Sequence, residues 1–397
     1  MASPVHAQTD APISMRALLA GARRKLPSML SLAQQLVLAE SPSGSKSAVD
    51  ACIALAAVRA RNLGARVKLH RQRQFGDFLE ARFSLRSTWS RDHARPLTKP
   101  ILVLGHLDTV WSLGTLKAMP CRVRDGRLWG PGALDMKAGV AMAFTAIELL
   151  LEAGLLRREI VLLLTSDEEI GSPASRPITE AIAKTCSAVY VVEPAQGLAY
   201  KTARKGVGNW RIGVTGVAAH AGVDFEKGAN AIRELARAIE TASGWTDLKR
   251  GLTVSVGVIA GGGASNVVPA KAWAEVDVRF PRAADGPRIA RQFAALQSTD
   301  PRCALTVSGG INRPPMERSR ATVLLYHKAR ALAAELGFAL EEASTGGASD
   351  GNFTAALGLP TLDGMGAVGE GAHARHESVF IDHLAPRTAL LAGMLII

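Results

Sequence analysis

Cysteine and aromatic residues are scarce in this sequence. Its 397 residues include only 4 cysteines, which are far apart and form no Cys-x-x-Cys pair: Cys52, Cys121, Cys186 and Cys303. We therefore expect reduced thiols, in the core or at the surface. Aromatic residues make up 5% of the chain, so few rings are available to stack on nucleic-acid bases.

Long hydrophobic runs are also missing. No apolar stretch reaches the length of a membrane span, so we expect no membrane partner. The segment Val5-His6-Ala7-Gln8 looks faintly like a signal-peptidase site, but no apolar core precedes it, and we expect no intact signal peptide. The expected location is cytoplasmic, or periplasmic if an export signal has been removed.

Acidic residues are fewer than basic ones. The chain has 47 Lys and Arg against 35 Asp and Glu, a formal net charge of +12. Because the basic residues are dispersed and form no recognisable nucleic-acid motif, we expect a small acidic substrate drawn to a positive cleft, and no nucleic acid. A content of 48% hydrophobic and 21% charged residues is typical of a globular protein, and the length predicts two domains.

The order of helical and strand patterns indicates how these domains are arranged. Both patterns occur up to about residue 205, as in an α/β domain. From 206 to 316 a β-α-β-β order predicts a separate α/β sandwich, in which residues 302–315 lead the chain back. The sequence therefore predicts a discontinuous domain, 1–205 and 317–397, interrupted by a smaller inserted one.

A histidine and an aspartate follow the first buried strand of the larger domain. His106 and Asp108 come directly after the apolar run 101–104. Positions i and i+2 of an extended segment share a face, so Asp108 can accept from one imidazole nitrogen while the other faces a metal. Taken alone, such a pair is more often a polar turn than a set of ligands.

Acidic residues follow the next two apolar runs. Residues 159–164 lead into Asp167, Glu168 and Glu169, and residues 188–192 lead into Glu193. An exposed loop explains either cluster by itself. Ligands in α/β sheets bind at the carboxyl ends of strands, so three such strand ends together favour a metal site.

Two further candidates lie in or beside glycine-rich segments. Asp135 follows the Gly-Pro-Gly turn at 130–132 and precedes a predicted helix over 137–152, so it is either a ligand or a helix N-cap. His373 lies in a segment whose glycines allow close backbone approach. With the strand-end residues, this set suffices for two divalent metals, a bridging carboxylate and one carboxylate left over as a base.

The sequence resembles the M20 metallopeptidases from about residue 25 onward. Five motifs carry the resemblance: Gly-His-Leu-Asp-Thr-Val at 105–110, Gly-Pro-Gly-Ala-Leu-Asp-Met-Lys-Ala-Gly at 130–139, Thr-Ser-Asp-Glu-Glu-Ile-Gly-Ser at 165–172, Val-Val-Glu-Pro at 191–194 and Gly-Ala-His at 371–373. The resemblance implies an α/β catalytic domain of the zinc-peptidase type, a mixed sheet flanked by helices. It also implies an inserted ferredoxin-like sandwich that serves as lid and dimer interface. The glutamate carboxypeptidases of the family look most similar.

For the metal centre, the resemblance implies two zinc ions per subunit, with Co or Mn as alternative metals. Asp135 would bridge the two ions. One ion would also take His106 and Glu193, and the other Glu169 and His373.

The resemblance also assigns roles beside the metals. Asp108 would orient His106. Glu168 would be the general base that activates the attacking water and later protonates the leaving amine. His376 competes with His373 as the ligand histidine, but we prefer His373 because it directly follows Gly371-Ala372.

For the substrate, the resemblance points mainly to the inserted domain. His220 would reach the partner subunit's site in a homodimer and stabilise the oxyanion, although a buried structural histidine is the simpler alternative. Asn266 and Arg279 would hold a substrate carboxylate, because the planar fork of arginine binds carboxylates bidentately. An ion pair with Asp277 is the alternative for Arg279. Backbone contacts to the substrate would come from Gly346 and Gly347.

These roles predict a di-zinc hydrolase that cleaves an amide bond and releases a C-terminal amino acid from a peptide or an N-acyl amino acid. An aminoacylase, a deacetylase or a di/tripeptidase of the same family is the alternative. A peptidase that binds a free amine needs an acidic pocket, for which Asp224 and Glu226 are candidates. A metal-free homologue that only binds a ligand is the alternative outside enzymes, and the complete set of competent side chains argues against it.

Overall fold

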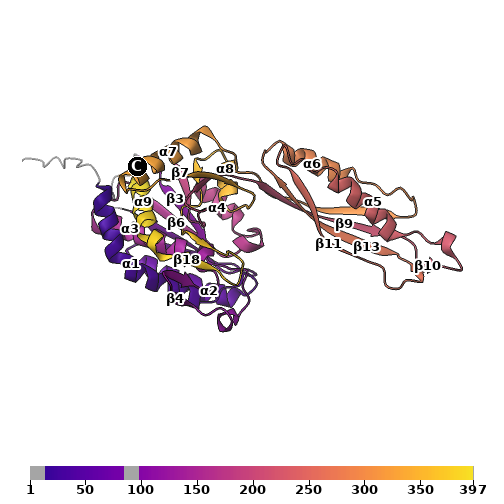
Figure 1. The fold of residues 1–397 in the computed structure, drawn as a ribbon, viewed down its shortest axis with the longest axis horizontal. Helices are drawn as coiled ribbons and strands as arrows, with labels where there is room; N and C mark the ends of the chain where they lie inside the picture. Colours follow the sequence, from indigo (N-terminus) through magenta and orange to yellow (C-terminus); the bar gives the residue numbers. More distant parts are fainter. Residues whose placement is uncertain (1–13, 85–97, 397) are drawn as a thin grey trace, which may run out of the picture.

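The computed structural model describes residues 14–84 and 98–396, so the segment at 5–8 lies outside it. Figure 1 shows a broad α/β body from which a narrower arm of strands and helices extends. The body contains the segments at both ends of the described chain, and the arm is built from its middle. None of the helices in the described ranges is long and apolar enough to cross a membrane.

A mixed six-stranded sheet forms the centre of the body, as the resemblance implied. The strands β6, β3, β7 and β16 are parallel, and β1 and β2 form an antiparallel hairpin at the β6 edge. β3, β6 and β7 are buried along their whole length, as expected for parallel strands covered on both faces. In the order of the sheet, the strands are β1 (Arg66–His70), β2 (Phe78–Phe83), β6 (Ile160–Thr165), β3 (Ile101–His106), β7 (Ala188–Val191) and β16 (Thr361–Leu362).

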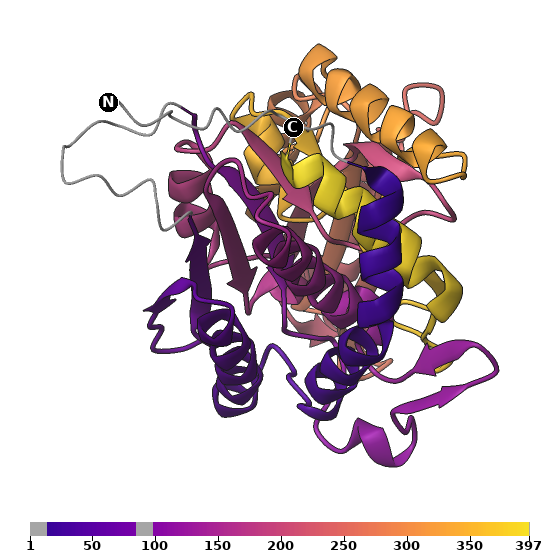
Figure 2. The ribbon, with the colours of Figure 1, turned by 90° about the vertical axis from the view of Figure 1, so that its left-hand side faces the viewer.

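Helices cover both faces of this sheet (Figure 2). One apolar cluster packs most of the helices against one face, and a second packs two short helices against the other. The first group consists of α1 (Met15–Leu38), α2 (Lys46–Asn62), α3 (Ala138–Glu152), α7 (Arg320–Glu335) and α9 (Leu384–Ile396). The second group consists of α4 (Arg176–Ala183) and α8 (Gly351–Ala356).

Two smaller sheets complete the body. β8 (Tyr200–Arg204) pairs in parallel with β15 (Glu342–Thr345). The other sheet has the order β17 (Gly369–Glu370), β18 (Ser378–Phe380), β5 (Arg127–Trp129) and β4 (Arg122–Arg124). Because Ser378 of β18 pairs with Trp129 of β5, the segment that carries His373 lies against the turn that carries Asp135.

The arm is a ferredoxin-like α/β sandwich. Its antiparallel sheet has the order β11 (Thr253–Gly261), β13 (Lys271–Phe280), β9 (Gly206–Thr215) and β14 (Ala304–Arg313). The helices α5 (Ala231–Ser243) and α6 (Asp285–Ala294) pack on one face of this sheet. A short pair at the far end of the arm consists of β10 (Ala219–His220) and β12 (Val267–Val268) (Figure 1).

The interpretation of residues 302–315 as a connection that only returns the chain to the larger domain is wrong. Residues 304–313 form β14, an edge strand of the arm, and α6 precedes it, so the predicted β-α-β-β order is completed to β-α-β-β-α-β. Most residues of β14 are exposed or half-buried, which leaves only a weak hydrophobic alternation in the sequence. Gly309, with φ +101°, and Gly310 weaken the pattern further.

Candidate metal centre

Three neighbouring strands deliver the predicted ligands to one edge of the central sheet. β3 ends at His106, β6 is followed by Glu168 and Glu169, and β7 is followed closely by Glu193. Because β6, β3 and β7 are adjacent and parallel, their carboxyl ends meet. The sequence-predicted side chains therefore converge from segments up to 87 residues apart, the interval from His106 to Glu193.

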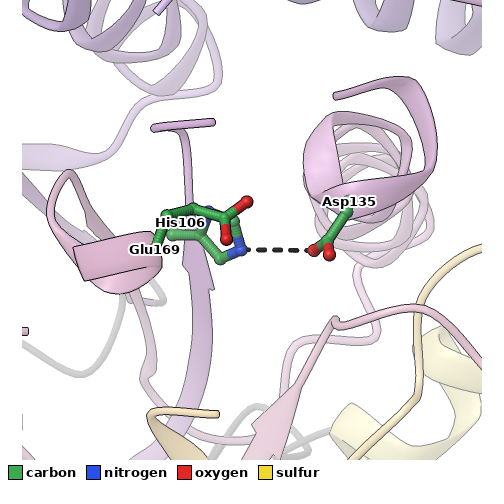
Figure 3. A group of neighbouring side chains, drawn as sticks. All are labelled: His106, Asp135 and Glu169. Atoms are coloured by element: carbon green, nitrogen blue, oxygen red, sulfur yellow. Dashed lines mark ion pairs between the residues drawn. The ribbon is translucent and has the colours of Figure 1, made fainter. Parts of the chain in front are cut away.

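His106 faces two carboxylates through one ring nitrogen. Its Nε2 lies 3.4 Å from Asp135 Oδ1 and 3.7 Å from Glu193 Oε1. Figure 3 shows the imidazole of His106 directed at the carboxylate of Asp135, with Glu169 beside it. Both His106 Nε2 and Asp135 Oδ1 are buried without a hydrogen-bond partner, which is rare for polar atoms in proteins. This set of one nitrogen and two carboxylate oxygens fits a divalent cation such as zinc.

His373 forms a second group with the other oxygen of Asp135. Its Nε2 lies 3.3 Å from Asp135 Oδ2 and 3.2 Å from Glu169 Oε2. Asp135 thus directs one oxygen at each histidine. Among the described residues, the ion-pair contacts with Asp135 and Glu169 on this side come from His373 and none from His376, the competing histidine.

Asp135 is not a helix N-cap. α3 begins three residues later at Ala138, Lys137 occupies its N-cap position, and no side chain makes a capping hydrogen bond there. The carboxylate therefore points at the two histidines instead of at helix N–H groups.

We expected the carboxylate of Asp108 to orient the ring of His106, but the shorter contact comes from the main chain of Asp108. His106 Nδ1 lies 3.0 Å from the main-chain oxygen of Asp108 and 3.4 Å from its Oδ1. The carboxylate accepts hydrogen bonds from Ser43 Oγ at 2.6 Å and from the N–H groups of Glu168 and Glu169, both at 3.2 Å. Asp108 therefore supports the histidine mainly through its backbone and fixes the adjacent glutamates with its side chain.

The three consecutive acids after β6 point in three directions, which relieves their mutual repulsion. Asp167 turns away and accepts from the N–H groups of Ala174 and Ser175, just before α4. Glu169 faces His373. Glu168 lies 2.9 Å from Nη2 of Arg313 and makes no contact with either histidine within ion-pair distance. Glu168 also forms, with His106 and Glu193, a group whose ligand atoms all lie within 4.8 Å of one another, so its position suits either a ligand or the predicted base.

The site is rich in buried negative charge. Burial raises the pKa of Glu168 well above its ordinary value, and burial together with the charge of Asp135 raises that of Glu193 to about 7. Burial alone would lower the pKa of His106, but Asp108 and Asp135 raise it well above its ordinary value. A divalent cation would relieve this repulsion between buried carboxylates, which is a second reason that the residues fit a metal.

Two buried arginines beside the site were missed by sequence reasoning. Nη2 of Arg313, the last residue of the arm, also lies 3.0 Å from Asp350 Oδ1 and 2.8 Å from Ser172 Oγ. Arg204, the last residue of β8, binds both oxygens of Asp363 and lies 3.8 Å from Glu193. In a chain with 47 basic residues nothing local marks these two, since their partners are distant in sequence.

The predicted substrate residues fall into two places. Arg279, Gly347 and His373 line one cleft of about 510 Å³ together with Glu168 and Glu169. Within it Arg279 forms a bidentate pair with Asp277, at 2.7 and 2.9 Å, and its Nη1 lies 3.5 Å from the oxygen of Gly346. His220 lies at the far end of the arm (Figure 1), with Asn266 beside it, since the Asn266 oxygen accepts from Ala221 N.

His220 is exposed, so the structure does not show the buried histidine considered above. Its Nδ1 accepts from the N–H groups of Gly222 and Val223 at 3.1 and 3.2 Å. Because Nδ1 is the acceptor, the proton of the neutral ring is on Nε2, which is free to donate.

Comparison with known proteins identifies the family to which this chain belongs. The model of peptidase family M20/M25/M40 matches residues 102–396. The chain belongs to this family. Among curated M20 relatives, it is 31% identical over 307 residues to carboxypeptidase G2 of Pseudomonas sp. (strain RS-16), covering 75% of this chain and 73% of that one. It is 28% identical over 330 residues to succinyl-diaminopimelate desuccinylase of Dechloromonas aromatica, covering 77% and 85%.

Solved M20 structures share the whole fold. Aminopeptidase PepT from Bacillus cereus superposes with a TM-score of 0.76 at 21% identity and covers 94% of this chain and 98% of that one. An M20 metallo-carboxypeptidase from Sulfolobus solfataricus gives 0.71 at 16% identity with the same coverage. The family match and the curated relatives together show an M20 hydrolase, of the peptidase or amidohydrolase type.

Proposed function

We propose that this M20 hydrolase uses two zinc ions to cleave an amide bond and releases a C-terminal amino acid from a peptide or an N-acyl amino acid. The observation that supports this most directly is the carboxylate of Asp135, whose two oxygens face His106 and His373. Each histidine also faces one glutamate, Glu193 or Glu169. One set would hold each ion, and Glu168 would remain free for proton transfer.

The metals would supply Lewis acidity, polarising the scissile carbonyl and making water a stronger nucleophile near neutral pH. The other tasks belong to side chains of the protein. Glu168 would take the proton of the attacking water and deliver it to the leaving nitrogen. Arg313 holds Glu168 Oε1 at 2.9 Å and so fixes the direction in which this carboxylate acts.

The leaving amino acid would dock through its carboxylate on the arginine side of the cleft. Arg279, Arg313, Asn209 and Asn312 line this side. The side chain of Arg279 is 34% exposed in its pair with Asp277, so a substrate carboxylate can exchange for Asp277 or bind at the remaining donors. The name of the relative carboxypeptidase G2 fits the same assignment.

A homodimer would complete the active site. The strand β10, which contains His220, lies at the far end of the arm, away from the body that carries the metal ligands (Figure 1). Asn266 lies beside it, since its main-chain oxygen accepts from Ala221 N. Apolar side chains at this end, Val223 and Phe225, are 76% and 61% exposed, as expected for a surface that becomes covered. The arm of a second copy would place the Nε2–H of His220 at the oxyanion formed during amide cleavage.

A substrate panel tests the preference for a free carboxylate. N-acyl amino acids should be hydrolysed with a kcat/KM about 10- to 100-fold above that of the same compounds with the carboxylate blocked as an amide, because a charged hydrogen bond is lost. Steady-state kinetics on matched pairs with N-acetyl, N-succinyl and N-aminoacyl groups gives this ratio and also separates carboxypeptidase from desuccinylase preference. Equal rates for free and blocked compounds would argue against the carboxylate site.

A further inference from the structure

Glu377 is a buried carboxylate to which the proposed chemistry gives no role. It lies four residues after His373 and is 1% exposed. No ion pair with a basic side chain is present for it in the described part of the chain. A buried carboxylate is costly unless its oxygens receive hydrogen bonds, so its partners show what it holds.

Four N–H groups converge on this carboxylate. Oε1 accepts from the backbone of Leu134 at 2.9 Å and of Asp135 at 3.1 Å. Oε2 accepts from the backbone of Gly132 at 2.9 Å and from Nε1 of Trp111 at 2.9 Å. Three of the four donors therefore belong to the turn that carries the bridging carboxylate.

This turn, residues 132–135, is not held in place by the hydrogen-bond ladder of a regular helix or strand. Gly132 has a φ of 71°, and Asp135 and Met136 are non-helical, so the segment is an irregular approach to α3. A helix or strand would satisfy its own N–H groups by its ladder, whereas here one side chain from a distant segment satisfies three of them. The position of Asp135 thus depends on Glu377.

Glu377 also connects this turn to the second histidine. The segment from 371 to 377 carries His373 at one end and Glu377 at the other, and β18 follows directly. By binding the 132–135 turn, Glu377 fixes the distance between Asp135 and His373, which is 3.3 Å from Oδ2 to Nε2.

We propose that Glu377 is a positioning residue of the metal centre, which holds the bridging Asp135 in place and adds a negative charge behind the two metal sites. The proposal rests on the metal centre of the proposed function. Outer carboxylates that orient metal ligands typically change metal affinity by about 10- to 100-fold when they are removed.

Glu377→Gln tests this role, because an amide has nearly the same shape but turns an NH₂ group toward N–H donors. The matched control is Glu370→Gln in the same segment, since Glu370 is 56% exposed and pairs with Arg127 at the surface. Metal-stripped protein is titrated with ZnCl₂ against a chromophoric chelator, and the visible absorption of the Co²⁺ form is recorded. Glu377→Gln should bind Zn²⁺ about 10- to 100-fold more weakly with an altered Co²⁺ band, and Glu370→Gln should match the wild type.

Wild-type Zn²⁺ affinity in folded Glu377→Gln would overturn the proposal. Trp111→Phe is the second variant, because it removes one donor and leaves the backbone donors in place, and it should weaken Zn²⁺ binding by about 2- to 10-fold. If Glu377→Gln does not fold, unchanged affinity in Trp111→Phe would overturn the proposal instead. A wild-type chain that binds no Zn²⁺ would refute the metal centre itself, so the two failures are distinguishable.

Discussion

Replacing Glu168 by glutamine is expected to lower kcat by about 1,000-fold while the protein still binds its metals. The amide cannot take a proton from water, and general acid–base catalysis contributes about 10²- to 10⁴-fold. Glu168 forms its ion pair with Arg313, and this contact favours the role of base over that of metal ligand. Steady-state kinetics on an N-acyl amino acid and metal analysis of the purified variant measure the two effects separately.

The neighbouring glutamate provides the control. Glu169 lies 3.2 Å from His373 Nε2. Glu169→Gln should therefore lose bound metal together with activity, in contrast to Glu168→Gln. Full activity in Glu168→Gln, or loss of metal in that variant to the extent seen in Glu169→Gln, would contradict the role of Glu168 as the base.

Replacing His220 by alanine is expected to lower kcat by about 10²- to 10³-fold with little change in KM, although this residue lies at the far end of the arm (Figure 1). Loss of a donor that acts only in the transition state reduces kcat and kcat/KM alike. The hydrogen bonds to Nδ1 leave Nε2–H free for such a role.

Mixed dimers show whether the histidine acts across subunits. Glu168→Gln and His220→Ala chains are unfolded together, refolded and assayed. In a mixed dimer one site receives both defects and the other receives none, so about half of the wild-type activity per mixed dimer should return. Activity no higher than that of the two inactive parents would contradict a shared site, provided that mixed dimers are shown to form.

The convergence of the candidate-site residues was largely predictable because their signals are local. His106, Glu168 and Glu193 each follow an apolar strand, and parallel strands bring their carboxyl ends together. The family motifs supplied the hypothesis that the pattern alone left open, namely that Asp135 would bridge two metals instead of capping a helix. The mixed sheet with an inserted ferredoxin-like domain followed from the same resemblance.

The supporting residues were not predictable because their partners are distant in sequence. Arg313 reaches Glu168 across 145 positions, and Glu377 reaches Asp135 across 242. Neither lies in a motif that marks it, and only the folded chain shows that each satisfies buried polar groups. The position of Asn266 at the end of the arm, apart from Arg279 in the cleft, also depends on how far the arm extends from the body.

The most direct test of the account is a zinc titration of metal-stripped protein, with bound metal and hydrolysis of an N-acyl amino acid measured at each point. The account predicts no activity without metal, recovery as zinc is added, and two bound zinc ions per chain at saturation. Full activity in the metal-stripped protein, confirmed by metal analysis, would contradict it.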